Sequence, residues 1–248
     1  MQRAATQNCE RQFLAAVRAR TARATVPGAL ADLDVVAFTR SKVAPMLRGL
    51  FPIAEQPPVL DMLARSVVFL TPATIALVLN RQSFLTTAWQ LANLYLASCG
   101  AQLLSADAPQ IVGLSDATSC YVSTAYFHPP HRLDDFLVHE AAHVFHNCKR
   151  VTVGLRGKRR REWLLDIAYD KRETFAYACE VYSRIVELGD SATARRRLLV
   201  EVEDGPMPTD EKVDTEEFIA VLRGAVAARN GWKCILEACA PIRRTRAA

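Results

Sequence analysis

Two histidines four residues apart are the residues of this sequence best suited to chemistry. They belong to the segment His139-Glu140-x-x-His143, inside a stretch from 133 to 147 that reads as one helix. Residues four apart lie on the same face of a helix, so both imidazoles can reach one metal ion. Glu140 lies beside the position that a water molecule would take on that ion. This spacing is typical of a Zn²⁺ site in which the glutamate acts as a base.

A zinc ion that acts in catalysis usually has three protein ligands and one open position, which calls for a third ligand. A helical pattern from about 162 to 188 places Asp166, Asp170, Glu173 and Glu180 on one stripe. Four acids beside the first helix would be costly to bury without a cation. We expect Glu173 to be the ligand, because small and apolar residues follow it and allow the two helices to approach. Asp170 is the alternative, and an ordinary solvated acidic face is the third interpretation.

The element that carries the histidines follows a short β segment. Residues 110–114 and 120–127 read as two strands joined by a turn at 115–118. Two prolines end this hairpin, and Asp134 or Asp135 can begin the metal helix. Further on, 195–202 reads as helical and 205–208 as a linker, and Asp214 with Glu217 resembles a capping box at the start of another helix.

The first hundred residues read as almost entirely helical. We expect breaks at Pro27 and Pro45, a loop around Pro57, and a helix starting at Thr71-Pro72. The stretch 84–96 is apolar nearly all round and Gly100 ends it. Polar residues interrupt every apolar window of roughly 18 residues, so a buried core helix is favoured over a membrane span. We therefore predict a mainly α chain of the α+β class, with a helical region at 1–105 and a region at 106–248 that contains a small antiparallel sheet. The two regions could also form one continuous domain.

The motif helix and the acidic helix together resemble a known family. His139-Glu140-x-x-His143 followed by Arg172-Glu173-Thr174-Phe175-Ala176 looks like a zincin metallopeptidase of the gluzincin type, with a layout similar to the ImmA/IrrE-like intracellular proteases. The resemblance covers about residues 110–190. It implies a zincin-like core in which an edge strand ahead of the motif helix lines the substrate cleft, and the hairpin at 110–128 fits that role. Neither the Asn-Glu-x-x-Ser-Asp pattern of thermolysin-like enzymes nor the metzincin extension is present.

The resemblance also implies a mechanism. His139, His143 and Glu173 would bind Zn²⁺, and Glu140 would take a proton from water and pass it to the leaving amine. A further donor should stabilise the oxyanion, and Tyr177, one turn after Glu173, is our candidate. Its rivals are Tyr126, His128 and Tyr169. Asp170 could orient a ligating histidine, and His146 reads as a surface or supporting histidine rather than a ligand.

Composition limits the other classes of function. The net charge of +5 is concentrated in basic clusters at 149–161, 195–197 and 243–246, which we interpret as solvated surface, although they could dock nucleic acid or another anion. Seven scattered cysteines form no disulfide or metal-knuckle pattern, and the amino terminus shows no secretory signal, so we expect reduced thiols and a cytoplasmic location.

Three hypotheses about function follow. The first is a zinc metallopeptidase that cuts an intracellular protein or peptide. The alternative is a non-catalytic protein on a zincin scaffold whose basic loops bind nucleic acid or a protein partner; the retained Glu140 argues against it. In the third, the motif is accidental and the chain is a helical structural protein. A lack of stoichiometric zinc in the purified protein would eliminate the first two hypotheses.

Overall fold

The computed structural model describes residues 12–109, 111–157 and 161–242. Of the residues that the structure describes, 59% are helix and 6% strand, which agrees with a mainly helical chain of the α+β class. The α-helices are α2 (Gly28–Ala31), α3 (Val35–Leu50), α4 (Gln56–Ala64), α5 (Ile75–Arg81), α6 (Leu85–Ser98), α7 (Phe136–Asn147), α8 (Arg172–Leu188), α9 (Ala192–Glu203), α10 (Thr215–Ala227) and α11 (Gly231–Ala238), with another helix at 12–20. Short 3-10 helices are η1 (Ile53–Glu55), η2 (Thr124–Phe127), η3 (Arg150–Val153) and η4 (Tyr169–Lys171).

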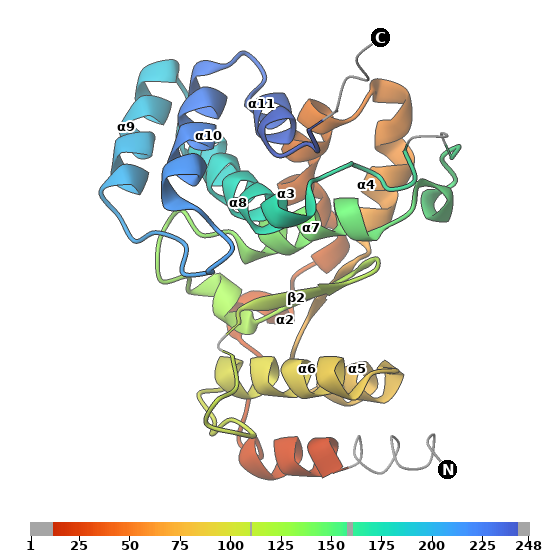
Figure 1. The fold of residues 1–248 in the computed structure, drawn as a ribbon. Helices are drawn as coiled ribbons and strands as arrows, with labels where there is room; N and C mark the ends of the chain where they lie inside the picture. The colour runs from red at the N-terminus through yellow and green to blue at the C-terminus, as the bar shows by residue number, and fades with distance from the viewer. Residues whose placement is uncertain (1–11, 110, 158–160, 243–248) are drawn as a thin grey trace.

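The sheet lies between two groups of helices (Figure 1). It consists of β1 (Val67–Phe69), β2 (Gly113–Asp116) and β3 (Ser119–Val122) in the order β1-β3-β2. β2 and β3 form an antiparallel hairpin, whereas β1 is parallel to β3. The predicted antiparallel sheet was therefore wrong in part, because the sheet is mixed. The chain returns from β1 through α5 and α6, and this crossover makes the two strands parallel.

The predicted hairpin is present, but its strands are shorter than expected. The second expected strand ends at Val122, because the Ser123 side chain accepts a hydrogen bond from the Ala125 N–H and starts η2. The turn is shorter too, and Ala117 lies in it with a positive φ of 50°. β2 occupies one edge of the sheet, next to α7.

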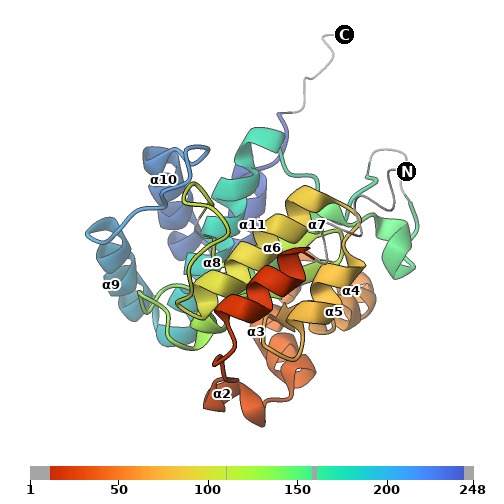
Figure 2. The same cartoon turned by 90° about the horizontal axis from the view of Figure 1, so that it is seen from below.

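Side chains on alternate sides of β3 enter two cores. Cys120 and Val122 belong to the larger core, which joins α3 and α4 to α7, α8 and the later helices. Tyr121 belongs to the smaller core, formed with α5, α6 and the helix at 12–20, which lie together in Figure 2. The larger core contains residues from both sides of position 105, such as Val43 and Phe145. The division into two regions stays a prediction.

Three proline predictions were wrong. Pro45 lies inside α3, where burial of neighbours such as Val43 and Leu47 offsets a cost of about 3 kcal/mol for an interior proline. Pro57, expected in a loop, lies in the first turn of α4, where a backbone N–H needs no helical partner. Thr71-Pro72 forms a turn that precedes α5, which begins at Ile75.

The apolar stretch at 84–96 forms α6, and Leu91, Ala92 and Leu96 on it are fully buried. Gly100, with φ of 63°, follows its end as predicted. Among the described residues, no helix is both long enough and apolar enough to cross a membrane.

Arg150 departs from the predicted solvated basic surface. Its side chain is buried, and its two terminal nitrogens donate to the carboxylate of Glu55 at 3.0 and 2.7 Å. A guanidinium group buried this deeply requires a carboxylate partner. A run of basic residues in the sequence does not show which of them is buried or paired. Residues 158–160 and the basic cluster at 243–246 lie outside the described residues.

Candidate metal centre

Helix α7 carries both histidines, and its sequence explains its position. Asp135 caps its amino end by accepting the Val138 N–H at 3.2 Å, so one of the two predicted caps is present. Ala141, Ala142 and Phe145 are fully buried and hold the helix in the larger core. This packing fixes the direction in which the histidine face points, toward α8.

The three predicted ligands lie together between α7 and α8. The Nε2 atoms of His139 and His143 are 3.1 Å apart, and the Glu173 Oε2 lies 3.8 and 3.3 Å from them, respectively. Ligand atoms about 2.1 Å from a tetrahedral zinc ion are about 3.4 Å apart, so this spacing fits the ion. The donor set, two imidazoles and one carboxylate, also fits zinc and leaves a fourth position.

Glu173 reaches the histidines from the first turn of α8. The predicted acidic stripe was wrong for Asp166 and Asp170, because the helix begins only at Arg172. Asp166 precedes it in a non-helical segment, and Asp170 is exposed in η4. Ala176, fully buried on the same face of α8 as Glu173, has a small side chain that lets α8 approach α7.

Glu180 supports His139 from the same helix as Glu173. Its Oε2 lies 3.0 Å from the His139 Nδ1, and its Oε1 accepts the Asp135 N–H at 2.8 Å. An imidazole that binds metal through Nε2 carries its proton on Nδ1, and a carboxylate there fixes that tautomer and the ring orientation. The sequence predicts Asp170 in this role, but Asp170 is exposed in η4. The spacing of seven residues from Glu173 to Glu180, two helical turns, is the sequence signal for the correct acid.

His143 has a corresponding partner in His146. The His143 Nδ1 lies 3.3 Å from the His146 Nε2, and His146 is buried. Burial lowers the pKa of His146 to about 3, and the Arg172 cation and any positive charge on His143 act in the same direction. A neutral ring with a free Nε2 lone pair can accept the Nδ1 proton of His143, so His146 supports a ligand, in line with its sequence-based interpretation.

Glu140 projects from α7 toward strand β2. A Cβ atom at Gly113 of that strand would lie 2.4 Å from the Glu140 Oε1, so the glycine makes room for the carboxylate. Ser115 of the same strand hydrogen-bonds the Glu140 side chain. Burial raises the pKa of Glu140 to about 7, against the lowering effect of His139. The carboxylate is thus held apart from bulk water beside the two histidines.

Tyr177 lies one turn beyond Glu173, and its ring packs edge-on against His139 with centroids 4.5 Å apart. Burial raises its pKa to about 12, so the hydroxyl remains a hydrogen-bond donor. Of its predicted rivals, Tyr169 is 80% exposed at the cleft and Tyr126 packs among Phe38 and Phe69. His128 is exposed and does not line the cleft.

An open cleft of about 1050 Å³ runs along these residues. One wall is β2 with Val112 before it, a second is the start of α8, and a third is the segment 205–210 after α9. The expected linker at 205–208 thus borders the site. Both histidines, Glu140, Glu173 and Tyr177 line the cleft, so a molecule in it can reach all of them.

Comparison with models of known protein families, with curated proteins and with solved structures gave no significant match. The functional conclusion therefore depends on the geometry of the site, that is, on the ligand atoms, their supporting hydrogen bonds and the cleft that exposes them.

Proposed function

We propose that this protein is a zinc-dependent metallopeptidase of the gluzincin type, with a zincin-like core formed by α7, α8 and the sheet. One observation carries the proposal: the Nε2 atoms of His139 and His143 and the Glu173 carboxylate converge within 4.8 Å, in a cleft that Glu140 also lines. This combination separates a hydrolytic site from a structural one, because structural zinc sites usually have four protein ligands and no open position.

The protein residues have distinct tasks in the proposed reaction. His139, His143 and Glu173 hold the ion, which when bound supplies Lewis acidity and lowers the pKa of water. The Glu140 carboxylate accepts a proton from the attacking water and then donates it to the nitrogen of the leaving amine. The Tyr177 hydroxyl donates a hydrogen bond to the carbonyl oxygen as negative charge develops there.

The edge strand supports a peptide as the substrate. β2 pairs with β3 on one side only among the described residues, and Gly113, Leu114 and Ser115 line the cleft. An extended peptide can add to such an edge through backbone hydrogen bonds. Glu140 contacts the same strand, so a peptide bound along β2 brings its backbone to the proposed base.

The test compares the wild type with Glu140→Gln, Glu173→Gln and the exposed control Glu216→Gln. We expect about one zinc per chain in the wild type, in the control and in Glu140→Gln, and much less in Glu173→Gln. Cleavage of labelled casein and of a synthetic peptide library, followed by mass spectrometry, should be lost in the first two variants only. Wild type without stoichiometric zinc, or undiminished cleavage by Glu140→Gln, would refute the proposal.

A further inference from the structure

We propose that Lys42, on helix α3 far from the motif in sequence, is a positioning residue for the metal ligand His139. This inference rests on the proposed metal site, but it assigns a task to a residue outside that site. It also assigns a task to the helical region that precedes the motif, whose role the sequence leaves open.

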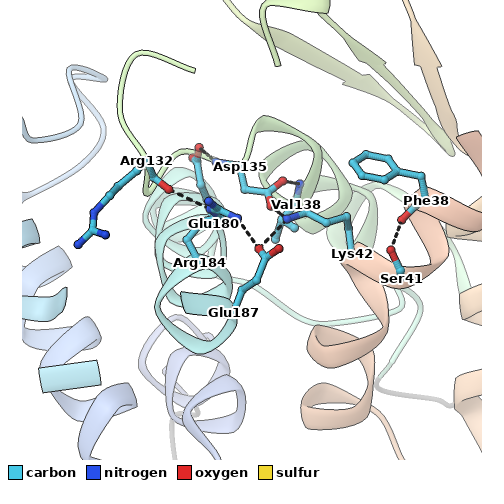
Figure 3. A network of polar contacts seen from close by, with 9 residues as sticks. All are labelled: Phe38, Ser41, Lys42, Arg132, Asp135, Val138, Glu180, Arg184 and Glu187. Carbon is cyan, nitrogen blue, oxygen red and sulfur yellow. Dashed lines mark hydrogen bonds and ion pairs between the residues drawn. The ribbon is translucent and has the colours of Figure 1, made fainter. Parts of the chain in front are cut away.

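A chain of contacts joins Lys42 to His139, and Figure 3 shows the part of it that runs from Lys42 through Asp135 to Glu180. The Lys42 Nζ lies 2.6 Å from the Asp135 Oδ2, and the Asp135 N–H donates to the Glu180 Oε1 at 2.8 Å. The other oxygen of Glu180 lies 3.0 Å from the His139 Nδ1. Every link is within hydrogen-bond distance, so a displacement of Asp135 reaches the ligand through one carboxylate.

Asp135 has two tasks that Lys42 can influence together. Its side chain caps α7 through the Val138 N–H, and its own N–H holds Glu180. Asp135 is 1% exposed, and the lysine side chain only 12%. A buried carboxylate that loses its cation is strongly destabilised, so the capping segment is expected to move when Lys42 is neutralised.

The distribution of charge makes the lysine specifically necessary. Asp135, Glu180, Glu140 and Glu173 bring four acids to one end of the α7–α8 interface. Lys42 also contacts Glu187 at 2.7 Å, but Glu187 has a second cation in Arg184 at 2.5 Å. Asp135 also has a hydrogen bond with Tyr126, a neutral phenol. Neutralising Lys42 therefore leaves Glu187 paired with Arg184, whereas Asp135 has no other cation in contact within the described part of the chain.

The proposal predicts a loss of zinc affinity that is separable from a loss of stability. Support residues behind a metal ligand typically contribute 10- to 100-fold in affinity, so Lys42→Met should weaken zinc binding by about tenfold or more. Lys42→Arg retains the charge, so its zinc affinity should stay within about threefold of the wild-type value. The measurement is competition for Zn²⁺ against a chromophoric chelator, on the full chain.

Two control variants distinguish positioning from general loosening of α3. Val43→Ala removes fully buried methyl groups from the next residue of the same helix without touching the network. It should lower stability to urea yet leave zinc affinity unchanged. Glu187→Gln, which leaves the Lys42–Asp135 pair in place, should also bind zinc like the wild type. In an Asp135→Asn background, Lys42→Met should have no further effect on affinity.

A second measurement does not require zinc. The ¹⁵N chemical shifts of the His139 ring report its tautomer, and Lys42→Met should change them whereas Lys42→Arg should not. Unchanged zinc affinity and ring shifts in folded Lys42→Met, or an equal loss of affinity in Val43→Ala, would overturn the inference. If wild type binds zinc but cleaves nothing, only the peptidase proposal fails. If wild type binds no zinc, the metal site fails and the ring shifts still decide the role of Lys42.

Discussion

Replacing Gly113 by alanine tests the placement of Glu140 most directly. The added Cβ would lie 2.4 Å from the Glu140 Oε1, 2.6 Å from its Cγ and 2.8 Å from its Cδ. Ordinary carbon contacts begin near 3.5 Å, so the overlap amounts to about 1 Å. Either the carboxylate moves or the edge strand yields, and both change the distance between the proposed base and a peptide bound along β2.

A misplacement of about 1 Å can cost on the order of 100-fold in rate, which corresponds to about 2.7 kcal/mol of transition-state stabilisation. We therefore expect Gly113→Ala to lower kcat/KM for a cleaved peptide by about two orders of magnitude. Zinc content should stay at the wild-type value, because Glu140 is not among the three converging ligands.

The control is Gly28→Ala, at a glycine where an added Cβ meets nothing within 4 Å. Peptide cleavage, zinc content and urea unfolding are measured for both variants. The reasoning is refuted if Gly113→Ala, folded and loaded with zinc, cleaves within about twofold of the wild type. A loss of zinc in this variant would equally contradict the placement, because it would mean that the strand supports the ligands.

Four further outcomes are expected. Zinc at about 100 times its Kd should stabilise the protein by about 2.7 kcal/mol, and a chelator should reverse the rise in melting temperature; no shift would contradict a native metal site. Glu180→Gln should weaken zinc binding by about 10- to 100-fold in the chelator competition while the far-UV spectrum stays native. Arg150→Met, which breaks the buried fork to Glu55, should lower the free energy of unfolding in urea by about 3–5 kcal/mol, and a change below about 1 kcal/mol would contradict its role in stability. Burial raises the pKa of Glu187, but the ion pair with Lys42 outweighs burial and lowers that pKa below its ordinary 4.5. The ionised Glu187 therefore stabilises the fold fully above pH 4.5, and this stabilisation is lost as the pH falls through the lowered pKa. The stability difference between wild type and Glu187→Gln should therefore be larger at pH 7 than at pH 3, and a difference independent of pH would refute the assignment.

Local sequence rules predicted the parts of the site that lie on single helices. The helical period placed His139 and His143 on one face, and Asp135 was one of two residues named as the helix cap. Glu173 was selected from an acidic stripe, and it does approach the histidines. The same stripe included Asp166 and Asp170 wrongly, because nothing in the pattern showed that α8 begins at Arg172.

Residues that meet the site from other elements were not predicted. The space that Gly113 leaves for the Glu140 side chain depends on how β2 packs against α7. A glycine in a short strand carries no sequence pattern that predicts which side chain lies beside it. Strand β1 is three residues long within an apolar stretch, so its parallel pairing with β3 also had no local signal. Lys42 is one of many lysines and arginines in the chain, and only the packing of α3 beside α7 and α8 brings it to Asp135.

The sequence by itself therefore determined the chemical types that the site contains and their spacing along α7, since a helix repeats every 3.6 residues wherever it folds. It also determined that the chain is mainly helical, because apolar periodicity is a local property. Only the tertiary structure decided which acid orients His139, which strand makes room for Glu140 and which cation holds Asp135. Those contacts join residues distant in the chain, and their geometry is fixed by how the helices and the sheet pack into a common core rather than by any local preference.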